Sequence, residues 1–321
     1  MKIKKDKTPI QPISGTKVPR FAGPSTFARL PELRDVESCD VAIVGVPFDA
    51  GTSYRPGARF GPQAIRQASR HLRTNYHPNY DTEPFKDQQF ADAGDITCNP
   101  FNIKEAIEQI QKSATELLAK VGGIISMGGD HTIALPLLRA VNHKNKGPVA
   151  LVHFDAHLDT WDTYFGAPYT HGTPFRRARE EKLFMEDSSM HVGIRGPLYS
   201  RNDLKDDAEF GFKIIHCDEF QTEGIDKIVK RIRDKVGNNP LYLSIDIDVL
   251  DPSHAPGTGT PEIAGMTTRE MVNVLRGLAG VNLLSADVVE VSPAYDHAEL
   301  TSLAAATIIF ELTNLFVRNP D

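Results

Sequence analysis

Residues 149–159 read VALVHFDAHLD, and this stretch decides the fold. The run 149–154 is almost wholly apolar, and an apolar run of this length without alternation is typical of a strand buried on both faces of a parallel sheet. Asp155, His157 and Asp159 follow at alternate positions, which places their side chains on one side of an extended chain. The stretch therefore predicts a buried parallel strand with polar groups at its carboxyl end.

Similar apolar runs alternate with helical patterns from residue 40 onward. Strands that alternate with helices predict an α/β protein whose parallel sheet is covered on both faces. Residues 73–102 are polar and irregular, and we expect no element there. The expected strands are 41–46, 123–127, 149–154, 190–194, 212–216, 241–247 and 283–289, and the expected helices are 62–72, 103–121, 135–142, 173–182, 226–236, 268–278 and 301–316.

Two further expected strands end in the same kind of polar cluster. Strand 123–127 runs into GGDH at 128–131, and strand 241–247 carries Asp246 near its end and is followed by Asp248. Ligand sites in parallel sheets lie beyond the carboxyl ends of the strands. Four carboxylates with two imidazoles are too many anionic ligands for one tetrahedral zinc ion, and they suit two ions of Mn²⁺ or a similar divalent metal that share one or two carboxylates. The candidate ligands are His131, Asp155, His157, Asp159, Asp246 and Asp248.

Turn and cap residues are the competing interpretation of these aspartates. Three clusters after three strands favour the metal site, because crowded carboxylates without cations would repel one another. Two further residues are candidates for chemistry. His171 lies on a loop and is either a proton shuttle or a surface residue, and Glu290 ends the last strand, where it either holds a cationic substrate or serves as a turn carboxylate.

These motifs together resemble the ureohydrolase family, which includes arginases and agmatinases. The resemblance covers about residues 40–315 and is carried by GGDH at 128–131, DAHLD at 155–159, SIDIDVLDP at 244–252, APGTGTPE at 255–262 and EVSP at 290–293. It implies a three-layer αβα sandwich with a mostly parallel sheet and a centre of two Mn²⁺ ions per chain. It also implies a homotrimer or homohexamer.

The resemblance further implies a role for each residue. One ion would be bound by His131, Asp155, Asp159 and Asp246, and the other by Asp155, His157, Asp246 and Asp248, so that Asp155 and Asp246 bridge. Glu290 would bind the substrate guanidinium, and His171 would help to move protons. The expected type of residue stands at each of these eight positions.

The chemistry follows from these residue types. A guanidinium group is stabilised by resonance, and two divalent ions can lower the pKa of a water molecule enough to supply hydroxide near neutral pH. Glu290 would hold the guanidinium beside that hydroxide through charge-assisted hydrogen bonds. Asp159 and His171 are the candidates to protonate the leaving amine. The expected products are urea and an amine.

The loops after the motifs bear on which substrate tail is bound. Arginases carry Asn and Ser residues after the second motif, whereas residues 160–169, TWDTYFGAPY, contain neither. Residues 47–57, PFDAGTSYRPG, resemble agmatinases and guanidino-acid hydrolases. Trp161 and Tyr164 are candidates to line the channel for the tail, with loop packing as the other interpretation of Trp161. Agmatine is the leading substrate, and an ω-guanidino acid such as guanidinobutyrate or guanidinopropionate is the alternative.

Two other classes of protein could carry part of this residue set. A metal-binding regulatory protein on the same fold would need the six ligands but neither Glu290 nor His171. A mononuclear zinc deacylase would need fewer ligands and would leave His131 unexplained. The presence of all these residues favours a binuclear hydrolase.

Composition excludes several partners. The chain has 42 acidic and 36 basic residues and a net charge of −6, which argues against a nucleic-acid partner. It has no apolar run of about 18 residues and no secretory signal, so we expect neither membrane insertion nor secretion. Its three separated cysteines, Cys39, Cys98 and Cys217, are typical of reduced thiols and predict a cytoplasmic protein. Residues 1–38 are read as an N-terminal arm and 39–321 as a single domain.

Overall fold

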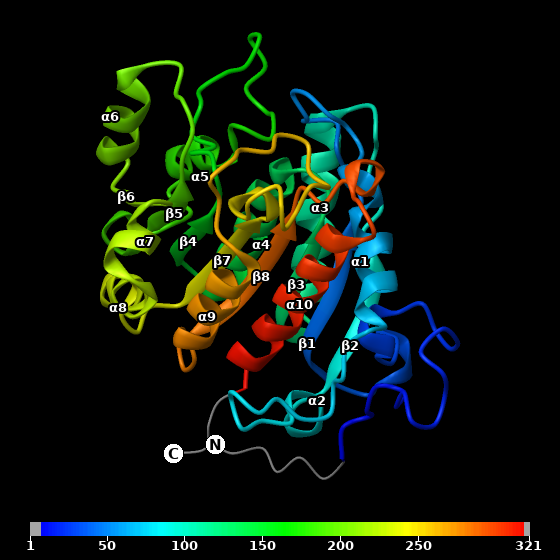
Figure 1. The fold of residues 1–321 in the computed structure, drawn as a ribbon. Helices are drawn as coiled ribbons and strands as arrows, with labels where there is room; N and C mark the ends of the chain where they lie inside the picture. Colours follow the sequence, from blue (N-terminus) through cyan, green and yellow to red (C-terminus); the bar gives the residue numbers. More distant parts are fainter. Residues whose placement is uncertain (1–7, 318–321) are drawn as a thin grey trace.

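The computed structural model describes residues 8–317, so residues 1–7 of the predicted arm and 318–321 of the predicted domain lie outside it. Eight strands pair in parallel in one sheet, with the order β2-β1-β3-β8-β7-β4-β5-β6 (Figure 1). The strands are β1 (Cys39–Val46), β2 (Phe90–Asp95), β3 (Val121–Gly128), β4 (Ala150–Phe154), β5 (Met190–Ile194), β6 (Lys213–His216), β7 (Leu241–Asp246) and β8 (Leu283–Val289).

Helices cover both faces of this sheet, which confirms the predicted αβα sandwich. Buried residues of α1, α8, α9 and α10 share one core with the sheet, and those of α3, α4 and α5 share the other (Figure 1). The helices are α1 (Gly61–Ser69), α2 (Pro84–Asp87), α3 (Ile103–Leu118), α4 (Ala134–Asn145), α5 (Pro174–Glu180), α6 (Arg201–Glu209), α7 (Glu219–Glu223), α8 (Ile225–Val236), α9 (Thr268–Gly277) and α10 (Leu300–Leu315).

Local sequence explains where the helices begin. Asn102 precedes α3 and its side chain accepts a hydrogen bond from the backbone N–H of Glu105, which satisfies a free donor of the first turn. Thr267 and Glu270 form a reciprocal capping box at α9. Within residues 8–317, no helix is both long and apolar enough to span a bilayer.

The expectation that residues 73–102 lack regular structure is wrong. They contain α2 and the edge strand β2, which pairs with β1. The sequence of β2, FADAGD, does not indicate a strand, because it has two aspartates and no apolar run. Asp92 is nevertheless buried, since the guanidinium of Arg66 in α1 bonds both of its carboxylate oxygens at 2.8 and 2.9 Å. A buried ion pair therefore replaces the apolar contacts that usually mark a strand.

The stretch 8–38 contributes to the core as well. Phe27, Ala28 and Leu30 are buried in the same core as α1 and α10. The backbone N–H of Phe27 donates to Asp92 at 2.7 Å, which ties this stretch to the edge strand.

Candidate metal centre

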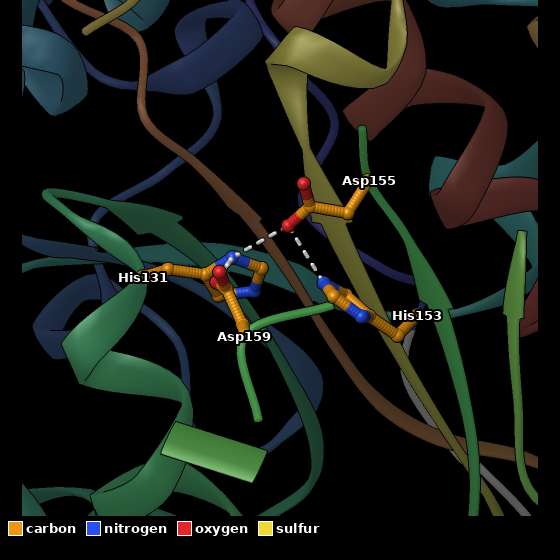
Figure 2. Close-up of side chains that lie close together, drawn as sticks. All are labelled: His131, His153, Asp155 and Asp159. Atoms are coloured by element: carbon orange, nitrogen blue, oxygen red, sulfur yellow. Dashed lines mark hydrogen bonds and ion pairs between the residues drawn. The ribbon is translucent and has the colours of Figure 1, made fainter. Parts of the chain in front are cut away.

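The carboxyl ends of β3, β8, β7 and β4 lie side by side, because these strands are parallel neighbours in the sheet. Five of the six predicted ligands follow β3, β4 or β7, Asp246 is the last residue of β7, and Glu290 follows β8. Figure 2 shows His131 and Asp155 facing each other, with Asp159 beside them. The predicted convergence of these residues is therefore observed.

The ring of His131 faces three carboxylates. Its Nδ1 lies 3.2 Å from Oδ2 of Asp155, 3.0 Å from Oδ2 of Asp159 and 3.3 Å from Oδ2 of Asp246. Its Nε2 lies 2.9 Å from Oγ of Ser244, which itself donates to Asp287 at 2.7 Å. Ser244 can therefore only accept from His131, so Nε2 carries a proton and Nδ1 of the neutral ring presents a lone pair to the carboxylates.

A lone pair that faces three anionic oxygens requires a cation between them. Nδ1 of His131 is buried and makes no hydrogen bond of good geometry. A proton can take this place in metal-free protein: burial lowers the pKa of His131, but the three carboxylates raise it well above its ordinary value. Histidine nitrogen and carboxylate oxygens are also the donors that Mn²⁺ accepts. The residues present therefore fit a divalent metal ion.

A second cluster adjoins the first. Nδ1 of His157 lies 3.2 Å from Oδ1 of Asp155 and 3.1 Å from Oδ2 of Asp248, an oxygen that has no hydrogen-bond partner. Asp155 thus turns one oxygen toward each cluster, the arrangement expected of a bridging ligand. Asp246 turns its Oδ2 toward His131 of the first cluster, and its Oδ1 accepts from the backbone N–H of Asp248 at 2.8 Å. Its bridging role stays a prediction.

The carboxylates are crowded away from water. Burial, together with the charges of Asp248 and Asp155, raises the pKa of Asp246 well above its ordinary value. Burial and the charge of Asp155 likewise raise the pKa of Asp248 to about 6. Two divalent cations would remove this repulsion, so the electrostatics and the donor set agree.

Glu290 and His171 lie beside these clusters as a hydrogen-bonded pair. Oε1 of Glu290 accepts from the backbone N–H of His131 at 2.9 Å and lies 3.0 Å from Nδ1 of His171. Its Oε2 is buried and has no partner within residues 8–317. Glu290 and Asp159 both have a left-handed backbone, with φ of 65° and 54°. Although burial lowers it, the pKa of His171 is raised to about 9 by the charges of Glu290, Asp159 and Asp130.

The two aromatic residues predicted to line the channel stack on each other, with centroids 5.3 Å apart and ring planes 14° apart. Trp161 covers Gly172, where an added Cβ would lie 2.8 Å from the indole ring. Trp161 therefore lies against the residue that follows His171. Tyr164 is farther along the loop, next to the exposed ring of Phe165.

Two buried residues of the site were missed from the sequence. His153 lies 2.8 Å from Asp155 through its Nε2, and its position two residues earlier in the same strand was the signal that could have revealed it (Figure 2). Asp130 in the GGDH motif turns away from the clusters and accepts from the backbone N–H of Gly51 at 2.7 Å. Because the carbonyl of Gly51 in turn accepts from the backbone N–H of His171, Asp130 positions the loop beside His171.

A model of the arginase family matches residues 39–314. The chain belongs to the arginase family. It is similar to putative agmatinase 1 of Schizosaccharomyces pombe, with 47% identity over 94% of this chain and 84% of the relative. It is also similar to a guanidinopropionase of Pseudomonas aeruginosa, with 43% identity over 96% of each chain. The solved structure of proclavaminate amidino hydrolase from Streptomyces clavuligerus superposes with a TM-score of 0.88, at 41% identity over 93% of this chain and 98% of that one.

Membership in the arginase family confirms the resemblance drawn from the motifs. The protein is an arginase-family ureohydrolase, an enzyme that cleaves guanidino compounds, and its His and Asp clusters can hold metal ions. The regulatory-protein and deacylase alternatives are therefore set aside. The names of its relatives divide between agmatine and guanidino acids.

Proposed function

We propose that the protein hydrolyses agmatine to putrescine and urea with two Mn²⁺ ions per chain. The observation that carries the reaction is the buried, unpartnered Oε2 of Glu290 beside the two metal-binding clusters. When bound, the metal pair would lower the pKa of a water molecule so that it attacks at neutral pH. The residues that would hold the metals are His131, Asp155, His157, Asp159, Asp246 and Asp248.

Glu290 is suited to bind the guanidinium. Its Oε1 already accepts two hydrogen bonds from the protein, so its carboxylate cannot rotate freely, while Oε2 is open to a donor. The backbone of Gly259 passes close to this oxygen: an added Cβ there would lie 3.6 Å from Oε2. A guanidinium group is planar, so it fits the narrow space between Gly259 and Glu290. Its paired N–H groups form charge-assisted hydrogen bonds with a carboxylate. Its central carbon is then held beside the clusters.

His171 and Asp159 are suited to move the proton to the leaving amine. His171 connects the buried site to the exposed side chain of Ser53, whose Oγ lies 2.6 Å from Nε2. Nδ1 on the other side of the ring faces Glu290 and therefore the substrate position. Asp159 contacts His131 through Oδ2, and its charge acts on His171. A proton can thus be passed from the attacking water through Asp159, or from solvent through Ser53 and His171.

The stacked rings of Trp161 and Tyr164 favour a substrate with an ammonium tail. Trp161 and Tyr164 present stacked rings near His171, and aromatic faces attract ammonium groups by about 0.5–2 kcal/mol. Agmatine carries a second cation at the end of its chain, whereas a guanidino acid carries a carboxylate there. The rings therefore support agmatine as the substrate.

One observation favours the alternative, an ω-guanidino acid. The guanidinium of Arg55 lies over the rings of Tyr54 and Tyr295, at 5.5 and 5.2 Å from their centroids, and makes no ion pair within residues 8–317. The carbonyl of Arg55 lies near Glu290, since an added Cβ at Gly259 would be 3.0 Å from that oxygen. A carboxylate tail directed toward Arg55 would gain a charge-assisted hydrogen bond.

Urea release decides between these substrates. With Mn²⁺ present, kcat/KM is measured side by side for agmatine, arginine, guanidinobutyrate and guanidinopropionate. We expect agmatine to be preferred, and a guanidino acid cleaved at least tenfold better would overturn that choice. No urea from any of the four would overturn the proposed reaction.

Two variants test the tail-binding residues. Trp161→Leu should raise KM for agmatine about 2- to 30-fold, the equivalent of the aromatic attraction. Arg55→Gln is the matched change and should leave KM for agmatine unaltered. The opposite pattern, with KM for guanidinobutyrate raised only in Arg55→Gln, would support the guanidino-acid alternative.

We further propose that the enzyme is a cytoplasmic homotrimer or homohexamer. Sedimentation equilibrium of the full chain tests the assembly, and a monomer would refute it. Fractionation of the cells that make the protein tests the compartment.

A further inference from the structure

A buried chain of side chains runs from Asp155 away from the substrate side of the metal centre. Nε2 of His153 lies 2.8 Å from Oδ2 of Asp155, and Nδ1 of His153 lies 2.7 Å from Nδ1 of His191. Nε2 of His191 lies 3.1 Å from Oδ1 of Asp207 in α6. All four side chains are fully buried. None of the proposed catalytic steps uses His153, His191 or Asp207.

Every ring nitrogen in this chain has a partner. Nε2 of His153 faces Asp155, the two Nδ1 atoms face each other, and Nε2 of His191 faces Asp207. The carboxylate of Asp155 can only accept, so Nε2 of His153 donates to it.

His153 lies beside the first cluster, but both of its ring nitrogens already have partners, Asp155 on one side and His191 on the other. His153 can instead act on Asp155. Oδ2 of Asp155 is held by His153, and Oδ1 accepts from the backbone N–H of His157 at 2.5 Å. The carboxylate is thus restrained at both oxygens.

Asp207 also restrains the second ligand loop. Its Oδ1 accepts from Oγ1 of Thr160 at 3.1 Å. Thr160 follows Asp159, whose left-handed backbone is unfavourable for a residue with a side chain. Asp207 of α6 therefore restrains the loop of Asp159 directly through Thr160. It restrains the carboxylate of Asp155 indirectly, through the rings of His191 and His153.

We propose that His153 is a positioning residue that holds Asp155 with one oxygen toward each metal position, and that His191 and Asp207 fix the orientation of its ring. The inference rests on the proposed metal centre. Hydrogen bonds to ligating carboxylates from outside the ligand set influence metal affinity by about 10- to 100-fold. The role is one of orientation, because both ring nitrogens of His153 are engaged, one by Asp155 and the other by His191.

The test measures Mn²⁺ binding to the full-length protein. His153→Phe removes the donor and keeps an aromatic ring where the imidazole packs 4.2 Å from the centroid of Phe175. His153→Gln keeps an N–H donor that can reach Asp155. Each metal-free protein is titrated with Mn²⁺ and followed by the electron paramagnetic resonance of the free ion, and its melting temperature without metal is recorded.

We expect His153→Phe to bind Mn²⁺ about 10- to 100-fold more weakly and His153→Gln to recover most of that loss. The matched control is His77→Phe. His77 is a buried histidine paired with Glu311 at 3.1 Å, outside the metal centre, so His77→Phe should lower the melting temperature without changing Mn²⁺ affinity.

The outcomes separate this inference from the proposed function. Wild-type affinity in His153→Phe would overturn the inference alone, as would equal losses in His153→Phe and His153→Gln. A wild-type chain that binds no Mn²⁺ would overturn both. If His153→Phe does not fold, His191→Phe provides the second test. Its ring replaces an imidazole that packs 3.9 Å from the centroid of Phe212, and it should weaken Mn²⁺ binding at least several-fold, whereas unchanged binding would contradict the inference.

Discussion

Replacing Glu290 by Gln tests the proposed substrate-binding group most directly. The side chain is 1% exposed, its Oε1 accepts from His131 and His171, and its Oε2 is unpartnered. Glutamine has the same shape, and its amide oxygen can keep both of the existing bonds. Its NH₂ group then takes the place of Oε2 and points N–H donors at the N–H donors of the guanidinium.

The expected fall in kcat/KM follows from these hydrogen bonds. A hydrogen bond to a charged group contributes about 1.5–3 kcal/mol, and a donor left unsatisfied in a buried site costs a further 1–3 kcal/mol or so. The loss of transition-state binding is then about 2.5–6 kcal/mol. At about 1.4 kcal/mol per tenfold change, kcat/KM should fall roughly 60- to 20,000-fold.

The assay is urea release at saturating Mn²⁺, with the metal content of the same sample measured beside it. Metal content should stay at two ions per chain, because Glu290 lies outside the proposed ligand set. Glu311→Gln is the control, since Glu311 is an equally buried carboxylate that bonds His77 and Arg276 instead. A value of kcat/KM for Glu290→Gln within tenfold of the wild type would refute the reasoning.

Three further outcomes are expected. Asp248→Ala should lose bound Mn²⁺ and at least about 100-fold in kcat/KM while circular dichroism stays native, and full activity would contradict the assigned cluster. Burial raises the pKa of Glu311, but hydrogen bonds to His77 and Arg276 outweigh burial and hold this pKa below its ordinary value. Its contribution to stability is therefore present above pH 4.5 or so and is lost as pH falls through the folded-state pKa, and Glu311→Gln should flatten the fall in metal-free melting temperature between about pH 5 and pH 3. Gly129→Ala should destabilise folding by about 3 kcal/mol or more in urea denaturation, because the added Cβ would lie 1.7 Å from the carbonyl oxygen of Phe48.

The sequence predicted the residues that combine a metal-binding side chain with a position at the carboxyl end of a strand. The apolar run 149–154 has one interpretation in a chain of alternating strands and helices, and the polar residues that end it must lie at the carboxyl edge of the sheet. His131, Asp155 and Asp248 could therefore be placed together without knowing the order of the strands. The structure confirms their proximity through the contacts of His131 and His157.

Other parts depend on pairings that no local pattern records. Strand β2 is polar because Asp92 meets Arg66 from α1, and neither residue alone indicates a strand. His153 looked like one polar residue inside an apolar strand. Its role depends on the register that sets it beside His191 in β5, and on the polar helix α6 that brings Asp207 to the same place. Packing between distant segments creates these contacts, so the sequence of any one segment could not predict them.

The left-handed backbone at Asp159 and Glu290 has a consequence for any attempt to engineer this enzyme. Each position places a residue with a Cβ in a region that glycine occupies freely, at an energetic cost of about 1–2 kcal/mol. Selection for thermal stability alone would therefore favour glycine at these two positions, and the variants that survive heat best would have lost the two carboxylates proposed for catalysis. A stabilised enzyme must be sought elsewhere in the fold, with turnover measured at every round.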